Sequence, residues 1–146
     1  MAFSNDFQVM DAGRYNVTAV NIGGFDSDDQ KPLFCVPPHT AGIKGVTIVD
    51  IVLVSDSTTS GSSLTDNYAF QIKDLTNSVS LISAAVSTSD TEITKDKAYH
   101  ITPDQNNENL GAATVLELNI TATDGGLLTD LSSAEVTAYV LWRWEV

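Results

Sequence analysis

TAYVLWRWEV, residues 137 to 146, indicates the fold class, because its apolar residues recur at every second position and not at the spacing of a helix. Successive side chains of a strand point to opposite sides, so one face of this stretch is wholly apolar. That face carries Ala138, Val140, Trp142, Trp144 and Val146. The other face carries Thr137, Tyr139, Leu141, Arg143 and Glu145. We therefore predict a strand that buries at least Trp142 in a core and presents Tyr139, Leu141 and Arg143 as candidates for a subunit contact.

Strand signals dominate the rest of the chain as well. Val, Ile, Thr and Tyr recur with period two, and the breaks between these runs are rich in Ser, Asp, Asn and Gly. The expected strands span residues 14–22, 32–36, 45–56, 67–74, 78–87, 97–102, 113–123 and 134–145. The gaps leave no room for crossover helices, so we expect an all-β fold: an antiparallel β-sandwich, jelly-roll-like, of about eight strands, in a single domain over residues 14–146.

The first 13 residues, MAFSNDFQVMDAG, differ from this pattern. Phe3, Phe7 and Met10 are separated by polar residues, and no nearby stretch offers a hairpin partner. We interpret residues 1–13 as an extended N-terminal arm, and these three side chains as candidate contacts with a partner or with another copy of the chain.

The stretch GVTIVDIVLV, residues 45 to 54, reads as apolar on both sides of a strand. With strict alternation, Val49, Ile51 and Leu53 line one face, and the other carries Val46, Ile48, Val52 and Val54. An outward apolar face of this size needs a cover, since monomers rarely expose large apolar patches. A second subunit would cover it, with Ile48 and Val52 in the contact; a loop or the arm of the same chain would serve equally.

The charge balance argues against several classes of partner. The chain has 19 acidic and 7 basic residues, for a net charge of -12, and the basic residues are scattered. Nucleic-acid binding needs a clustered basic face, so we expect no nucleic-acid partner. No apolar run approaches the roughly 20 residues of a spanning helix, and the beginning lacks the features of a secretory signal, so we expect neither membrane insertion nor secretion by the general route. The acidity favours solubility at high local concentration or, as an alternative, a basic partner surface.

No motif for catalysis or metal binding stands out. His39 and His100 are the only histidines and lie far apart in sequence, and no G-x-S-x-G elbow is present. FDSDDQK, residues 25–31, begins like a calcium loop but has Lys31 where the turn requires Gly. Cys35 lies in the apolar stretch PLFCVPP, where we expect a buried, unreactive thiol. The sequence therefore predicts no enzyme, no cofactor and no metal site.

The order of segments over residues 45–146 resembles the layout of small jelly-roll decoration (cementing) proteins on the heads of tailed bacteriophages. A strand ending in a polar loop leads to an aromatic-x-Phe-x-aliphatic strand, here Tyr68, Phe70 and Ile72. A short hairpin follows, then a glycine-led strand, LGAATVLELNI, and a closing strand after a Leu-Ser turn, LSSAEVTAYVLWRW.

The resemblance implies a structural role in the virion, with the protein made in the host cytoplasm. Such proteins bind the outer surface of the capsid, often as homotrimers, and reinforce the contacts between major capsid subunits. The partners would be the major capsid protein and the chain itself. The arm of residues 1–13 departs from the minimal pattern, so whether it contacts the capsid or a neighbouring copy stays open. The alternative is a carbohydrate- or receptor-binding β-sandwich of a tail fibre or a secreted protein, which would bind through exposed aromatic residues.

Overall fold

The computed structural model describes residues 15–59 and 63–146 and folds them into strands, turns and loops without a helix. The proposed arm, with Phe3, Phe7 and Met10, lies outside the described residues. The strands are β1 (Asn16–Asn21), β2 (Asp29–Cys35), β3 (Gly45–Ser55), β4 (Asp66–Asp74), β5 (Val79–Ser80), β6 (Val86–Ser87), β7 (Tyr99–Ile101), β8 (Val115–Asp124) and β9 (Val136–Glu145).

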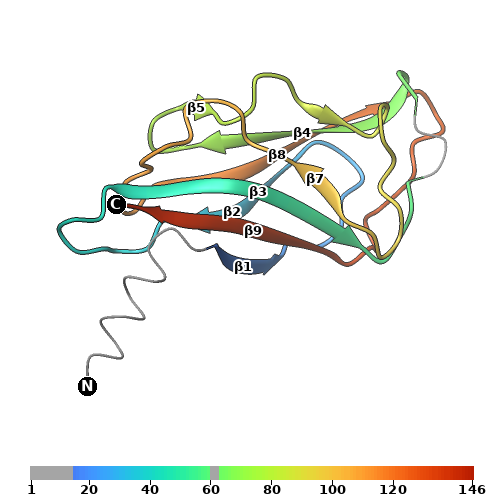
Figure 1. Ribbon diagram of the computed structural model, residues 1–146. Coiled ribbons are helices and arrows are strands. Elements are labelled where there is room, and N and C mark those ends of the chain that lie inside the picture. Colours follow the sequence, from blue (N-terminus) through green and yellow to red (C-terminus); the bar gives the residue numbers. More distant parts are fainter. Residues whose placement is uncertain (1–14, 60–62) are drawn as a thin grey trace.

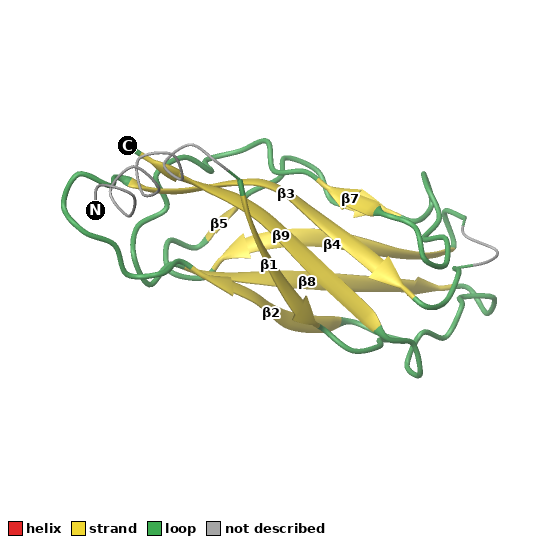
Figure 2. Cartoon of the chain, turned by 60° about the horizontal axis from the view of Figure 1, so that its bottom comes forward, coloured by secondary structure: helices red, strands yellow, loops and turns green. Residues whose placement is uncertain are grey.

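The strands form two antiparallel sheets packed as two layers (Figures 1 and 2). One sheet has four strands in the order β1-β9-β3-β7. The other has five, in the order β2-β8-β4-β5, with β6 also pairing with β4. The expected all-β antiparallel sandwich is confirmed.

The pairing of strands is nested. β1 pairs with β9, β2 with β8, β3 with β7, and β4 with β5. The chain thus runs as one long hairpin whose tip is the β4–β5 turn, and the hairpin is rolled so that β9 also pairs with β3 and β8 with β4. This is the topology of a jelly roll, which closes a sandwich from two interleaved sets of strands.

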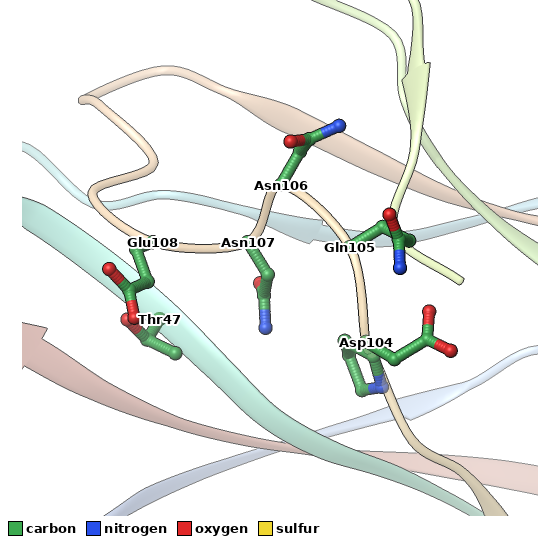
Figure 3. Close-up of a pocket in the computed structure, with 7 residues that line it drawn as sticks. Thr47, Asp104, Gln105, Asn106, Asn107 and Glu108 are labelled. Carbon is green, nitrogen blue, oxygen red and sulfur yellow. The ribbon is translucent and has the colours of Figure 1, made fainter. Parts of the chain in front are cut away.

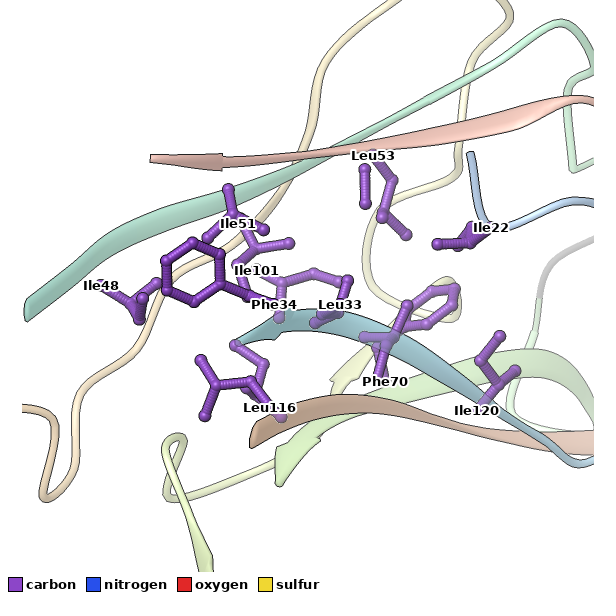
Figure 4. Close-up of a cluster of buried hydrophobic side chains, with 14 of the residues drawn as sticks. Ile22, Leu33, Phe34, Ile48, Ile51, Leu53, Phe70, Ile101, Leu116 and Ile120 are labelled. Carbon is purple, nitrogen blue, oxygen red and sulfur yellow. The ribbon is translucent and has the colours of Figure 1, made fainter. Parts of the chain in front are cut away.

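The core lies between the inner faces of the two sheets (Figure 4). Ile48, Ile51 and Leu53 from β3 face Phe70 of β4 and Leu116 of β8. These side chains are almost completely buried, and such burial is the main stabilising contribution to a fold of this kind.

The last strand confirms the predicted burial of Trp142. Trp142 is 8% exposed as a residue, and its indole Nε1–H donates a hydrogen bond to Thr18 Oγ1 at 3.0 Å. Trp144 is half-buried and meets Trp142 edge-to-face, with ring centroids 5.0 Å apart. The strand is therefore an integral part of the sandwich.

A β-bulge in β3 corrects the predicted faces of that strand. Ile48 pairs with Trp142 and Asp50 with Leu141, so Val49 is an extra residue without a partner. An extra residue reverses the alternation beyond it, and this reversal keeps both Ile48 and Ile51 in the core. The prediction that Ile48 points outward with Val52 is therefore wrong: Ile48 is 1% exposed.

A second bulge corrects the prediction for Cys35. Pro32 pairs with Glu117 and Phe34 with Leu116, so Leu33 is the extra residue of β2. Leu33 and Phe34 are both buried, and the next residue, Cys35, is exposed instead of buried.

The single strand expected over residues 78–87 is not formed. This stretch holds two short strands instead, β5 and β6.

Candidate interaction surface

The two outer faces of the sandwich differ in chemistry. On the five-stranded sheet, Gln30, Asn119 and Gln71 lie side by side across β2, β8 and β4, and Glu117 pairs with Lys73. A hollow of about 490 Å³ on this side is lined by Asp28, Asp29, Gln30, Asn119, Ile120 and Thr121. Polar side chains therefore occupy this outer face, and of the paired residues Gln30 is exposed and the others are half-buried.

The outer side of the four-stranded sheet carries an apolar row. Ala19 of β1 pairs with Tyr139 of β9, Tyr139 with Val52 of β3, and Val52 with His100 of β7. Directly opposed residues of antiparallel strands share a face and contact each other. The row therefore crosses all four strands and ends on an imidazole.

A second row runs beside the first. Val17 pairs with Leu141, and Leu141 with Asp50. Val17 is 61% exposed and Tyr139 is 39% exposed, although both belong to the regular part of the sheet. We call this surface the β1–β9–β3 face and define it by its apolar members: Val17, Ala19, Val52, Val54, Tyr139 and Leu141.

Asp50 and Glu145, the carboxylates on this side, both lie within hydrogen-bond distance of neighbouring side chains. The Nδ1 atom of His100 lies 2.6 Å from Asp50 Oδ2, and the Thr102 hydroxyl donates to Asp50 Oδ1 at 2.9 Å. Glu145 accepts hydrogen bonds from the Thr47 hydroxyl at 2.5 Å and from Arg143 Nε at 3.0 Å. Thr47, and then Arg143, lower the pKa of the Glu145 carboxyl. Within the described part of the chain, both carboxylates of this face thus have side-chain partners.

The structure brings together four of the residues that the sequence singled out. Val52, Tyr139, Leu141 and Arg143 all lie on the outer side of the four-stranded sheet. Ile48 does not join them, because the bulge turns it inward. The role of these four residues in an interface stays a prediction, as does the role of the arm residues.

Sequence reasoning missed the contribution of β1. Val17 and Ala19 extend the apolar rows to the edge of the sheet, where both are exposed. Their strand, NVTAVN, carries apolar residues on both sides, so alternation alone does not say which side faces out. The exposed side becomes clear only from the pairing with β9.

A polar hollow of about 620 Å³ lies at the end of the sandwich where β7 ends (Figure 3). Its lining consists of Thr47, Pro103, Asp104, Gln105, Asn106, Asn107 and Glu108. Asp104 accepts hydrogen bonds from the backbone N–H and the hydroxyl of Ser83, which lower the pKa of its carboxyl. Asn107 exchanges hydrogen bonds with the backbone of Ile48. Two of the polar side chains thus serve the fold, whereas Gln105, Asn106 and Glu108 are exposed.

Within residues 15–59 and 63–146, no group of three or more His, Cys, Asp or Glu side chains is arranged to hold a metal ion. No helix within these ranges has the length and apolar character to cross a membrane. Comparison with protein-family models and with curated protein sequences gives no match for the chain.

Proposed function

We propose that the chain is a structural virion protein that binds the outer surface of a bacteriophage capsid and reinforces contacts between major capsid subunits as a homotrimer. The observation that carries the proposal is the asymmetry of the sandwich: one outer face is polar, and the β1–β9–β3 face is apolar with its charges paired. A protein that works through such a face needs a rigid scaffold and a partner surface, not a reactive group.

The β1–β9–β3 face suits contact with a second copy of the chain. Tyr139, Leu141 and Arg143 are an aromatic, an aliphatic and an arginine side chain, and aromatic residues and Arg are enriched in interface cores. The net charge of -12 makes two copies repel each other over most orientations. Contact through a face whose carboxylates are already paired keeps that repulsion small.

The capsid part of the proposal rests on the resemblance of segment order over residues 45–146 and on the jelly-roll topology that supports it. In this role the partner is the major capsid protein and the place of action is the virion. An acidic exterior would keep neighbouring trimers from adhering non-specifically on a crowded capsid.

The molar mass of the purified chain, measured by light scattering during size-exclusion chromatography over a range of concentrations, tests self-association. We expect a species of three times the 15.6 kDa mass of the chain. A strict monomer at every concentration contradicts the homotrimer. Co-sedimentation of the same preparation with capsids of tailed phages tests the second half of the proposal, and a chain that stays in the supernatant contradicts it.

The polar hollow of Figure 3 favours a second candidate, a carbohydrate-binding module. Amide and carboxylate groups such as those of Gln105, Asn106 and Glu108 can bind sugar hydroxyls. The residues that line the hollow include no aromatic ring on which a sugar could stack, and this weighs against the candidate. Glycan binding that is lost in Asn106→Ala would support it, and a chain that binds no glycan would remove it.

A further inference from the structure

One end of the sandwich exposes two leucines. It lies where β3 and β8 end and where β4 and β9 begin, at the right of Figure 1. Leu64, before β4, is 86% exposed and Leu127, after β8, is 76% exposed. Among the described residues these are the two most exposed large apolar side chains.

Hydrogen bonds hold the two leucine-bearing loops together. The Asp66 carboxylate accepts the backbone N–H of Leu127 at 2.8 Å, that of Gly125 at 2.9 Å and the hydroxyl of Thr65 at 3.0 Å. The Asn67 amide donates to the Leu64 carbonyl at 3.2 Å. The backbones of both leucines are therefore fixed before any partner arrives, which lowers the entropy lost on binding.

Two further loops complete this end. Three backbone N–H groups here donate hydrogen bonds to backbone carbonyls: that of Asp56 to Glu135, that of Thr59 to Ile93, and that of Asp96 to Ser55. A bridge between Phe25 and Leu131 ties the loop after β1 to the loop before β9. We call the surface formed by residues 22–28, 56–59, 63–65, 88–98 and 125–135 the leucine end.

The leucine end is strongly acidic. It carries two lysines, Lys95 and Lys97, and the following acidic residues: Asp26, Asp28, Asp56, Asp90, Glu92, Asp96, Asp130 and Glu135. The loops of the opposite end, residues 36–44, 75–78 and 102–114, carry only Asp104 and Glu108 against Lys44. The loops of the leucine end are therefore far more acidic than the loops of the opposite end.

We propose that the leucine end docks onto an unlike protein that offers an apolar pocket for Leu64 and Leu127 within a rim of Lys and Arg side chains. A second copy of the chain would bring the same acidic surface and be repelled, as would a nucleic acid or an anionic membrane. The inference rests on the proposed function in one respect, the existence of an unlike partner, which there is the capsid subunit. It adds the surface that meets this partner and the chemistry of the site that receives it.

Selection of short random peptides, displayed on particles, against the immobilised full chain tests this inference. We expect the selected peptides to combine large apolar residues with Lys or Arg. Their binding should weaken at least about tenfold in the double variant L64S/L127S, and it should also weaken with added salt, because salt screens the acidic rim. Acidic or uncharged selected peptides, no selection at all, or equal binding to the double variant would each overturn the inference.

Leu75→Ser is the matched control. Leu75 is also exposed, at 50%, but it lies in the β4–β5 turn at the opposite end, so this variant should bind the peptides as the parent chain does. All three replaced leucines are exposed, and the variants should therefore fold. Molar mass provides a separate readout. A monomeric chain that still binds the peptides contradicts the homotrimer and supports docking through the leucine end. A trimer that selects no such peptides supports the homotrimer and contradicts docking through the leucine end.

Discussion

Tyr139 of β9 lies directly opposite Val52 of β3 on the outer side of the four-stranded sheet. The neighbouring residues of both strands, Val140 and Leu53, are fully buried and point to the core. One pair of strands therefore supplies the core on one side and the β1–β9–β3 face on the other. Substitutions on the two sides should have different consequences, because inward changes alter folding and outward changes alter association.

Val52→Glu should dissociate the oligomer and leave the chain folded. The new carboxylate would face another copy across an apolar contact, where an unpaired charge is strongly unfavourable. Light scattering should then give the mass of a single chain, with an unchanged far-UV circular dichroism spectrum. Gln71→Glu, on the polar face of the five-stranded sheet, is the control and should leave the mass unaltered. An oligomer that survives Val52→Glu would show that this face is not the interface.

Ile48→Ala should instead lower the stability of the chain itself. Ile48 is 1% exposed, and removal of a buried isoleucine side chain costs about 2–5 kcal/mol of the free energy of unfolding. The urea midpoint at one fixed chain concentration measures the effect, and Val49→Ala at the half-buried bulge position provides a milder comparison. A loss for Ile48→Ala no greater than that for Val49→Ala would contradict the assignment of Ile48 to the core.

The bulges mark where sequence reasoning reached its limit. Two-residue alternation was enough for the fold class, for the burial of Trp142 and for the outward placement of Tyr139. It could not reveal that Val49 and Leu33 are extra residues, because a bulge depends on the partner strand and leaves no period of its own in the sequence. Ile48 was misplaced for this reason, and Cys35 because the apolar stretch around it gave no sign that the bulge at Leu33 turns the thiol outward.

The leucine end could not be predicted from the sequence, for a different reason. Leu64 and Leu127 lie in polar stretches far apart in the chain, and only the folded β4 and β8 bring their loops together. The acidic loops are visible in the sequence, yet their gathering at one end depends on strand directions that the nested pairing sets. Local periodicity carries no information about such long-range neighbours.

Trp142 provides a test of the sandwich core. Trp142→Ala should lower the free energy of unfolding by about 3–5 kcal/mol, as for other buried aromatic residues. Thr18→Val removes only the acceptor of the indole N–H, and a buried donor left without a partner costs about 1–3 kcal/mol. Chemical denaturation gives both values. Equal stability of Thr18→Val and the parent chain would show that the indole finds another acceptor, such as water.

Tyr68 links β4 to the loop before β9 and should titrate unusually. Its hydroxyl donates to the Thr129 carbonyl at 2.6 Å. Burial, and then the nearby Asp130 and Asp26, raise the pKa of the Tyr68 phenol to about 12. Burial likewise raises the pKa of the Tyr99 phenol.

The folded chain holds the protons of these two phenols above pH 10, where unfolded tyrosines lose them. The stability of the fold should therefore fall as the pH rises above about 10. Absorbance titration of the native chain should show late-ionising tyrosines that ionise normally in urea, and Tyr68→Phe should remove one of them. A native titration curve that matches the curve in urea would contradict the burial of both phenols.

Asp66 should make the leucine end sensitive to acid. The backbone N–H of Leu127, followed by the Thr65 hydroxyl and the backbone N–H of Gly125, lowers the pKa of the Asp66 carboxyl. A folded-state pKa below the unfolded value means that the unfolded chain binds the proton more readily. The stabilisation is therefore complete above the unfolded pKa of about 4 and is lost as the pH falls through the folded value.

Asp66→Asn should accordingly be less stable than the parent chain near neutral pH, and the difference in melting temperature between the two should shrink as the pH falls below about 4. The variant keeps one amide oxygen as an acceptor but loses the charge that strengthens the three hydrogen bonds. Hydrogen exchange at the amides of Gly125 and Leu127 locates the effect, since both should exchange faster in the variant, whereas the amides of β3 should not.

Asp104→Asn is the matched control, because the Asp104 carboxyl also accepts hydrogen bonds but lies at the opposite end of the sandwich. It should leave the Gly125 and Leu127 amides protected. A difference in stability that stays constant down to pH 2 would show that Asp66 acts through its shape and not through its charge.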